Sequence, residues 1–225
     1  PILAHYDVTL PAGTTDVVAG WTNIVALEAR RESPHRRIHV ADTPDLRWRV
    51  VYETDAQISS ISGRDRIFSF IEVRPARTGA GSEHVVMLLD TYAGNTRELD
   101  RSLLSEKASH AAAHERHRPT ALTNGGFVAW TKWIERPDGT ITWEVYDLPA
   151  HIPGARPRPG PKEDVPIVLL YPDPVTYLTR SGSVDKVIAY GSTGFRATII
   201  EATWVEAVVW AGGPIAAVAA PPGAA

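Results

Sequence analysis

The sequence predicts an all-β protein, a β-propeller of four-stranded antiparallel blades. One observation is a glycine that opens an apolar run at three places: Gly20, Gly63 and Gly126. The other is an aspartate that closes the strand pattern following each of these runs: Asp42, Asp90 and Asp147. A pattern that repeats at a similar interval indicates an architecture more strongly than single strands do. The recurring glycine and aspartate are therefore the basis of the fold prediction.

Short runs of β-branched and aromatic residues, separated by Gly, Pro, Asp and Asn, dominate the chain, and helical periodicity is nearly absent. Aligning the glycines and aspartates gives units of four strands. The expected first strands are residues 16–19, 57–62, 120–123 and 175–179. The expected second strands are 24–29, 66–73, 127–133 and 186–190. The expected third strands are 37–41, 84–89, 141–146 and 196–202. The expected fourth strands are 48–52, 96–99, 167–170 and 207–210.

Small sheets with two apolar faces and no helices between them pack radially as blades, which favours a propeller. The fourth unit begins at Gly182 but has Glu201 in place of the closing aspartate. Residues 214–219 resemble the inner strand of a fifth unit, so a fifth blade or a larger ring stays open. The alternative fold is a β-sandwich, which does not require the two repeated residues to recur in phase. We expect one domain over residues 1–218 and a disordered tail over 219–225.

The pattern of residues 86–99, an apolar strand, Asp90, a few turn residues and a second strand, resembles the outer hairpin of propellers of the Tol-system and prolyl-oligopeptidase type. The resemblance covers most of residues 16–210. It implies that Asp42, Asp90 and Asp147 cap tight turns by accepting backbone N–H bonds. These aspartates are therefore expected to be structural.

Composition excludes several kinds of function. A net charge of −3 does not indicate a nucleic-acid partner. The absence of cysteine excludes disulfides, a thiol nucleophile and a thiolate metal site. The longest apolar stretch is interrupted by Glu206, two glycines and Pro214, so no membrane span is predicted. A chain that starts at Pro1 and has Met87 as its sole methionine is explained by a removed signal, a removed tag or a fragment; we expect a periplasmic or secreted protein.

The most specific local pattern lies in an expected helical insertion near residues 100–118. With helical periodicity over roughly Ser102 to Arg116, the residues Glu106, His110, His114 and His117 share one face. The opposite, apolar side is expected to dock on the propeller and comprises Leu104, Ala108, Ala111 and Ala112. A histidine pair four residues apart is a known zinc-binding pattern, so zinc is the one cofactor considered. The alternative interpretation is a solvated helix face.

Catalytic signals are weak, and no catalytic residue is assigned. The sequence has no nucleophile elbow and no phosphate-binding loop. Asp16, Asp55 and Asp185 lie near expected inner strands, where a propeller glycosidase would need its acids. The proline-rich stretch 151–162 is interpreted as an exposed loop or an extended docking arm.

The sequence therefore favours a non-catalytic binding or scaffolding module that engages a protein or glycan through loop surfaces. The alternative is an enzyme: a propeller glycoside hydrolase, or the propeller portion of a serine-peptidase-like protein.

Overall fold

The computed structural model describes residues 7–20, 22–30, 33–77, 79, 81–108, 119–191, 196–202, 204–210 and 215–220. These residues form four four-stranded antiparallel sheets and one two-stranded sheet. The predicted all-β fold of four-stranded blades is confirmed. In the part of the chain that the structure describes, no helix is long and apolar enough to cross a membrane.

Within each sheet, the strands follow one another in chain order. The first blade contains β1 (Thr14–Ala19), β2 (Asn23–Ala29), β3 (Arg36–Asp42) and β4 (Trp48–Thr54). The second contains β5 (Gln57–Arg64), β6 (Ile67–Pro75), β7 (Gly81–Asp90) and β8 (Asn95–Ser105). The third contains β9 (Ala121–Thr123), β10 (Phe127–Glu135), β11 (Ile141–Pro149) and β12 (Arg158–Glu163). The fourth contains β13 (Ile167–Pro172), β14 (Val175–Ser181), β15 (Val184–Tyr190) and β16 (Arg196–Ala202). The two-stranded sheet contains β17 (Trp204–Trp210) and β18 (Ile215–Ala220).

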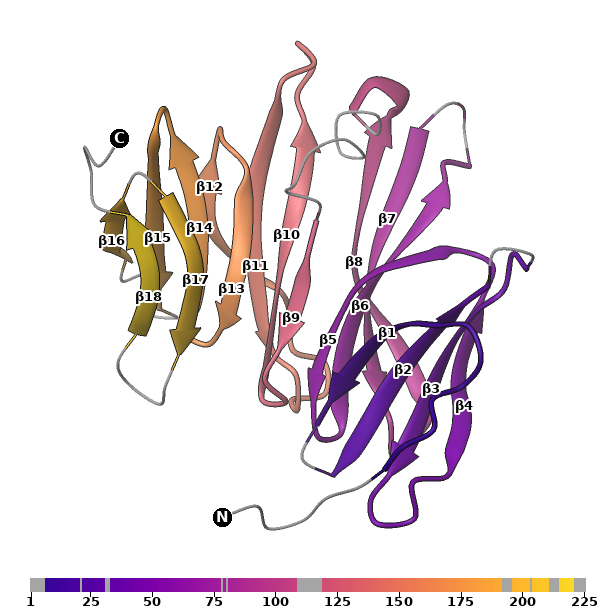
Figure 1. Ribbon diagram of the computed structural model, residues 1–225. Coiled ribbons are helices and arrows are strands. Elements are labelled where there is room, and N and C mark those ends of the chain that lie inside the picture. Colours follow the sequence, from indigo (N-terminus) through magenta and orange to yellow (C-terminus); the bar gives the residue numbers. More distant parts are fainter. Residues whose placement is uncertain are drawn as a thin grey trace.

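The sheets stand side by side in chain order, from the first blade to the two-stranded sheet (Figure 1). The first strands of neighbouring blades contact one another: β1 contacts β5, β5 contacts β9, and β9 contacts β13. These strands therefore form the inner side of the arrangement. The outer strands β4, β8, β12 and β16 lie at the opposite edge of each sheet.

An apolar cluster fills each junction between neighbouring sheets. The largest fully buried side chains belong to these clusters: Trp130, Trp133, Tyr177, Phe68 and Phe70. Apolar residues thus cover both faces of the second, third and fourth blades, as radial packing requires.

Small side chains bring the inner strands of the second and third blades together. Ser60 has a left-handed backbone, with φ of 57°, beside a bulge in β5. Its hydroxyl oxygen accepts a hydrogen bond from the backbone N–H of Ala121, at 3.1 Å. The bulge therefore directs a polar group of β5 to the first strand of the next blade.

The predicted strand order is wrong from the third blade onward. Its fourth strand is β12, inside the proline-rich stretch, whereas residues 167–170 begin the fourth blade. An edge strand tolerates Pro159 and Pro161 because it pairs on one side only. The fourth blade therefore begins one strand earlier than predicted. Residues 207–210, expected as its last strand, belong to β17 of the additional sheet.

The helical insertion also begins later than predicted. Strand β8 continues through Ser105 because its last residues still pair with β7, and residues 106–108 are helical. Leu104 and Ala108 are buried in the cluster that contains Trp133. His110, His114 and His117 lie in residues 109–118, outside the described residues. Of the tail expected over 219–225, Ala219 and Ala220 pair in β18, and residues 221–225 lie outside the described part.

Candidate functional site

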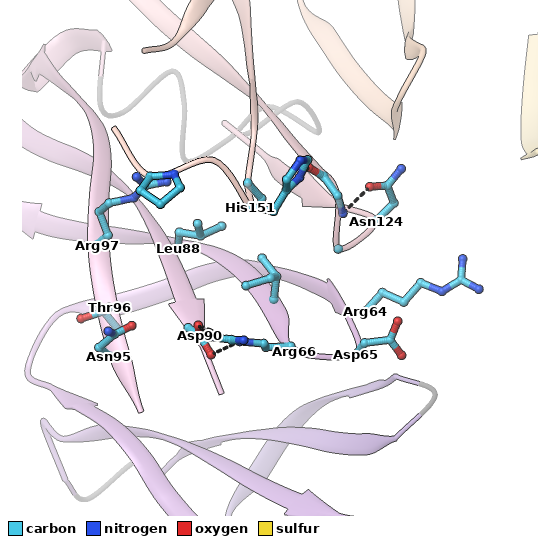
Figure 2. Close-up of a pocket in the computed structure, with 15 residues that line it drawn as sticks. Arg64, Asp65, Arg66, Leu88, Asp90, Asn95, Thr96, Arg97, Asn124 and His151 are labelled. Carbon is cyan, nitrogen blue, oxygen red and sulfur yellow. Dashed lines mark hydrogen bonds and ion pairs between the residues drawn. The ribbon is translucent and has the colours of Figure 1, made fainter. Parts of the chain in front are cut away.

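A cavity of about 700 Å³ lies where turns of the second blade meet turns of the third. The second blade contributes the β5–β6 and β7–β8 turns, and the third contributes the β9–β10 and β11–β12 turns (Figure 2). This volume lies within the range of about 300–1,000 Å³ that is usual for ligand pockets. The cavity is therefore the candidate binding site.

Strand β8 places Arg97 in the cavity wall. Arg97 lies directly opposite Leu88 of β7, and Leu88 belongs to the apolar cluster between the second and third blades. Because directly paired residues share one face of a sheet, Arg97 also projects toward the third blade. Its side chain is half-buried and has no hydrogen-bond or ion-pair partner among the described residues.

A second arginine, Arg66, forms an ion pair with Asp90. Its Nε lies 2.7 and 2.8 Å from the two carboxylate oxygens, and Nη2 contacts the same carboxylate (Figure 2). Asp90 also accepts the backbone N–H groups of Tyr92 and Ala93, each at 3.0 Å. The hydrogen bond from Arg66 lowers the pKa of Asp90 below its usual value. Asp90 is thus an ionised structural acid and a poor proton acceptor.

The β9–β10 turn supplies an amide group from the third blade. The side-chain oxygen of Asn124 accepts the backbone N–H groups of Gly126 and Phe127, at 3.0 and 2.9 Å. The oxygen is therefore occupied, and its NH₂ group is available to donate. Gly125 in the same turn has a φ of 92°, a conformation that favours glycine.

Exposed apolar residues flank the cavity. Tyr92, in the β7–β8 turn, has 71% of its surface exposed, and the Arg66 guanidinium lies 5.8 Å from its ring centroid. Ile152, in the β11–β12 loop, is 46% exposed and sits between the lining residues His151 and Pro153. Exposed large apolar side chains beside a cavity are typical of binding surfaces.

The acids considered for glycosidase chemistry do not line this cavity. Asp16 is exposed on β1, and Asp55 follows β4 and pairs with His35 at 2.6 Å. Asp185 is buried on β15, where it binds Arg180 at 2.6 Å and the backbone N–H of Val205 at 3.0 Å. Each acid thus belongs to a different local structure.

The aspartates of the repeat are bound to arginines. Asp90 caps its turn as predicted. Asp42 and Asp147 instead accept hydrogen bonds from arginine side chains, Asp42 from Arg49 at 3.2 Å and Asp147 from Arg158 at 2.8 Å. Their predicted role as backbone caps is wrong, because an arginine on the adjacent outer strand reaches the carboxylate.

One serine–histidine contact was not expected from the sequence. The hydroxyl of Ser82 lies 3.0 Å from Nε2 of His84. Nδ1 of His84 is buried without a hydrogen-bond partner in the described part of the chain, and burial lowers the pKa of His84 to about 4. Catalytic serine–histidine pairs have a third group that orients the base, and no such group contacts Nδ1 of His84 among the described residues. Among the described residues, no three His, Asp or Glu side chains are placed to hold a metal ion.

No family model matches the chain, and no curated protein is similar to it in sequence. Solved structures are similar in fold. The acylaminoacyl peptidase of Pyrococcus horikoshii aligns with a TM-score of 0.59 and 11% identity, over 92% of this chain and 38% of its own. An acylaminoacyl peptidase in complex with Z-Gly-Gly-Phe-chloromethyl ketone aligns with a TM-score of 0.63 and 12% identity, over 91% and 35%. The β-propeller domain of the trilobed protease from Pyrococcus furiosus aligns with a TM-score of 0.54 and 14% identity, over 83% and 58%.

At these identities the comparisons show the fold alone. They confirm the β-propeller and its predicted resemblance to propellers of the peptidase type. The chain spans between 35% and 58% of the length of these three structures.

Proposed function

We propose that this chain is a non-catalytic β-propeller domain that binds a protein partner through the loop surface around the cavity between the second and third blades. The observation that carries the proposal is the composition of this surface. It combines Arg97, which has no partner among the described residues, with the exposed apolar residues Tyr92 and Ile152. Interfaces are enriched in arginine and aromatic residues of this kind.

The state of Asp90 in the cavity, and of two acids elsewhere, supports binding rather than catalysis. The carboxylate of Asp90 is held by Arg66 and two backbone N–H groups, and its pKa is lowered, so it is a weak general base. Elsewhere, Asp185 is held by Arg180 and Asp147 by Arg158. Acids bound in this way stabilise the blades and are not available for proton transfer.

A protein partner is favoured over a glycan because the tryptophans of the third blade, which lines the cavity, are buried and offer no stacking platform there. Trp130, Trp133 and Trp143 are buried between blades. Trp133 and Trp143 pack edge to face, with ring centroids 5.2 Å apart. Their role is core packing.

The second candidate function is the propeller portion of a serine-peptidase-like enzyme. It is favoured by the likeness in fold to two acylaminoacyl peptidases and to the propeller domain of a protease. In that case catalysis belongs to another part of the protein, and the surface described above binds substrate or a neighbouring domain. The predicted periplasmic or secreted location stays a prediction.

The test is selection of peptides from a random displayed library on the purified chain, followed by fluorescence polarisation with the selected peptides. We expect Tyr92→Ala to weaken their binding about tenfold or more, as truncation of an aromatic anchor does. The matched control is Leu103→Ala, which removes an exposed apolar side chain of β8 away from the cavity lining. Selected peptides that bind equally to Tyr92→Ala, or a library that yields no binders, would contradict the proposal.

A fluorophosphonate probe tests the non-catalytic assignment separately. We expect no covalent labelling of the chain. Labelling that disappears in Ser82→Ala would overturn the assignment and identify the Ser82–His84 pair as a nucleophile and its base.

A further inference from the structure

We propose that the cavity between the second and third blades recognises a carboxylate of a peptide ligand, and that Arg97 is the cation that binds it. The inference rests on the proposed function because it specifies the chemistry of the peptide that the propeller binds.

The charge balance distinguishes Arg97 from the other lining cations. In the ion pair of Arg66 with Asp90, the positive and negative charges compensate each other. Arg64, the last residue of β5, and Asp65, the first residue of the turn that follows, carry opposite charges. Arg97 remains as a half-buried cation with no ion-pair partner among the described residues. A cation in this position is best compensated by an anion that arrives with the ligand.

The walls offer more donors than acceptors. A guanidinium has five N–H donors and no acceptor. The amide of Asn124 contributes its NH₂ group, since its oxygen already accepts two backbone N–H bonds. Figure 2 shows Arg97 and Asn124 at opposite sides of the cavity. Arg97 would thus bind a carboxylate in the two-bond geometry that arginine favours, and Asn124 would donate to a backbone carbonyl of the same peptide.

The fixed acids favour a monoanion over a phosphate group. Asp65 and Asp90 both line the cavity. A phosphate group carries a charge of about −1.5 to −2 at neutral pH, so these carboxylates repel it more strongly than they repel a carboxylate. A single negative charge matches a single uncompensated arginine.

The cavity floor suits the residue next to the carboxylate. Ile67, Leu88 and Ala150 line the cavity and belong to, or pack against, the apolar cluster between the two blades. An aliphatic side chain placed there would be removed from water. The preferred ligand is therefore a peptide with an aliphatic residue beside a carboxylate.

The experiment is an NMR titration of the isotope-labelled chain, in which the side-chain Nε–H of Arg97 and the backbone amides of Gly125 and Gly126 are followed. Two carboxylate probes distinguish the sources: acetyl-Leu-Glu-amide carries a side-chain carboxylate, and acetyl-Ala-Leu carries a C-terminal one. Acetyl-Leu-Gln-amide is the neutral match, and inorganic phosphate is the competing anion.

We expect at least one carboxylate peptide to shift these resonances and the neutral peptide to bind about tenfold more weakly, as loss of a charged hydrogen bond predicts. Arg97→Gln should remove this difference, whereas Arg97→Lys, which keeps the charge and loses the two-bond geometry, should reduce it. The control is Arg47→Gln, which removes the same charge from an exposed arginine of the β3–β4 turn.

The outcomes separate this inference from the proposed function. If the neutral peptide shifts the cavity resonances as strongly as the acids do, the cavity binds peptides but the carboxylate assignment is wrong. If phosphate binds as tightly as the carboxylate peptides, the preference for a monoanion is wrong. If no peptide shifts the cavity resonances while library-selected peptides still lose affinity in Tyr92→Ala, the carboxylate inference is overturned and the proposed function stands.

Discussion

The phenolic O–H of Tyr52 donates a hydrogen bond to Oε1 of Glu72, 2.6 Å away, across the junction between the first and second blades. Glu72 is completely buried on β6, and it also binds Arg74. Burial, followed by the hydrogen bond to Glu72, raises the pKa of Tyr52 to about 12. The first junction is therefore closed by an aromatic donor and a carboxylate.

The next two junctions also have a hydrogen bond from an aromatic side chain to a carboxylate, but the strands that carry donor and acceptor are exchanged. The indole N–H of Trp130 donates to Asp100 at 3.0 Å, and the hydroxyl of Tyr177 donates to Glu163 at 2.9 Å. In both, the acid lies on the outer strand of one blade and the donor on the second strand of the next. In the first junction, the donor lies on the outer strand. A directional bond thus supplements apolar packing at each junction between four-stranded blades.

Substitution of Tyr52 by phenylalanine tests the first of these bonds. We expect Tyr52→Phe to lower the free energy of unfolding by about 1.5–3 kcal/mol, the range for hydrogen bonds to charged groups, because the buried carboxylate of Glu72 loses a donor. The measurement is urea denaturation followed by tryptophan fluorescence. Tyr92→Phe is the control: Tyr92 is 71% exposed, and its substitution should change stability by less than about 0.5 kcal/mol. Equal stability of the two variants would contradict the prediction.

Substitution of Asp100 tests the second junction. Asp100 accepts both the indole N–H of Trp130 and the ammonium of Lys132, the latter at 2.7 Å. We expect Asp100→Ala to cost about 1–3 kcal/mol, since it leaves a buried indole donor unsatisfied. Asp164→Ala removes a carboxylate that pairs with Arg136 at 2.8 Å but is 75% exposed, and it should cost less than about 1 kcal/mol. Thermal unfolding of both variants provides the comparison, and a larger loss for Asp164→Ala would refute this ranking.

The repeat could be recognised from sequence because the strand periodicity and the turn glycines are local signals. The assignment of strands to blades fails where the local signal misleads. Pro159 and Pro161 indicate a loop, but both lie in β12. Their placement depends on the neighbouring strand, whose Asp147 binds Arg158 and whose Glu144 binds Lys162. Tertiary pairing therefore overrides proline's usual preference at this edge strand.

Gly63, one of the repeated glycines, is required by a buried ring. A Cβ atom added at Gly63 would lie 2.0 Å from the ring of Phe68, which is fully buried. We expect Gly63→Ala to destabilise the chain by about 1–3 kcal/mol because Phe68 must leave its packed position. At Gly126 the nearest atom would be 3.7 Å away, so Gly126→Ala should be tolerated. Urea denaturation of the two variants checks the difference, and similar midpoints would show that the ring relocates without cost.

The candidate site could not be predicted from the sequence. Arg97 and Asn124 occupy ordinary hairpin positions, and neither belongs to a motif. They line one cavity because the β7–β8 register turns Arg97 toward the third blade and because the β9–β10 turn of that blade faces the second. Both conditions depend on how two blades pack, which the local pattern does not encode.

The buried imidazole of His84 predicts a pH dependence of stability. Burial lowers its pKa from the ordinary value of 6.5 to about 4 in the folded chain. Between these values the unfolded chain binds a proton that the folded chain does not, so the free energy of unfolding falls as the pH decreases from about 6.5 to about 4. The full loss from this group is on the order of 3 kcal/mol. The carboxylates with lowered pKa, such as Asp90 and Glu28, act at lower pH, since their unfolded-state values are near 4.

His84→Gln, which replaces the imidazole by a neutral amide, should therefore flatten the stability profile between pH 6.5 and 4. His151→Gln, at an exposed position of the β11–β12 loop, should keep the slope of the wild-type chain. The measurement is urea denaturation of the three proteins at half-unit steps of pH. A wild-type profile already flat over this range, or a slope retained in His84→Gln, would show that His84 is protonated in the folded chain as readily as in the unfolded one.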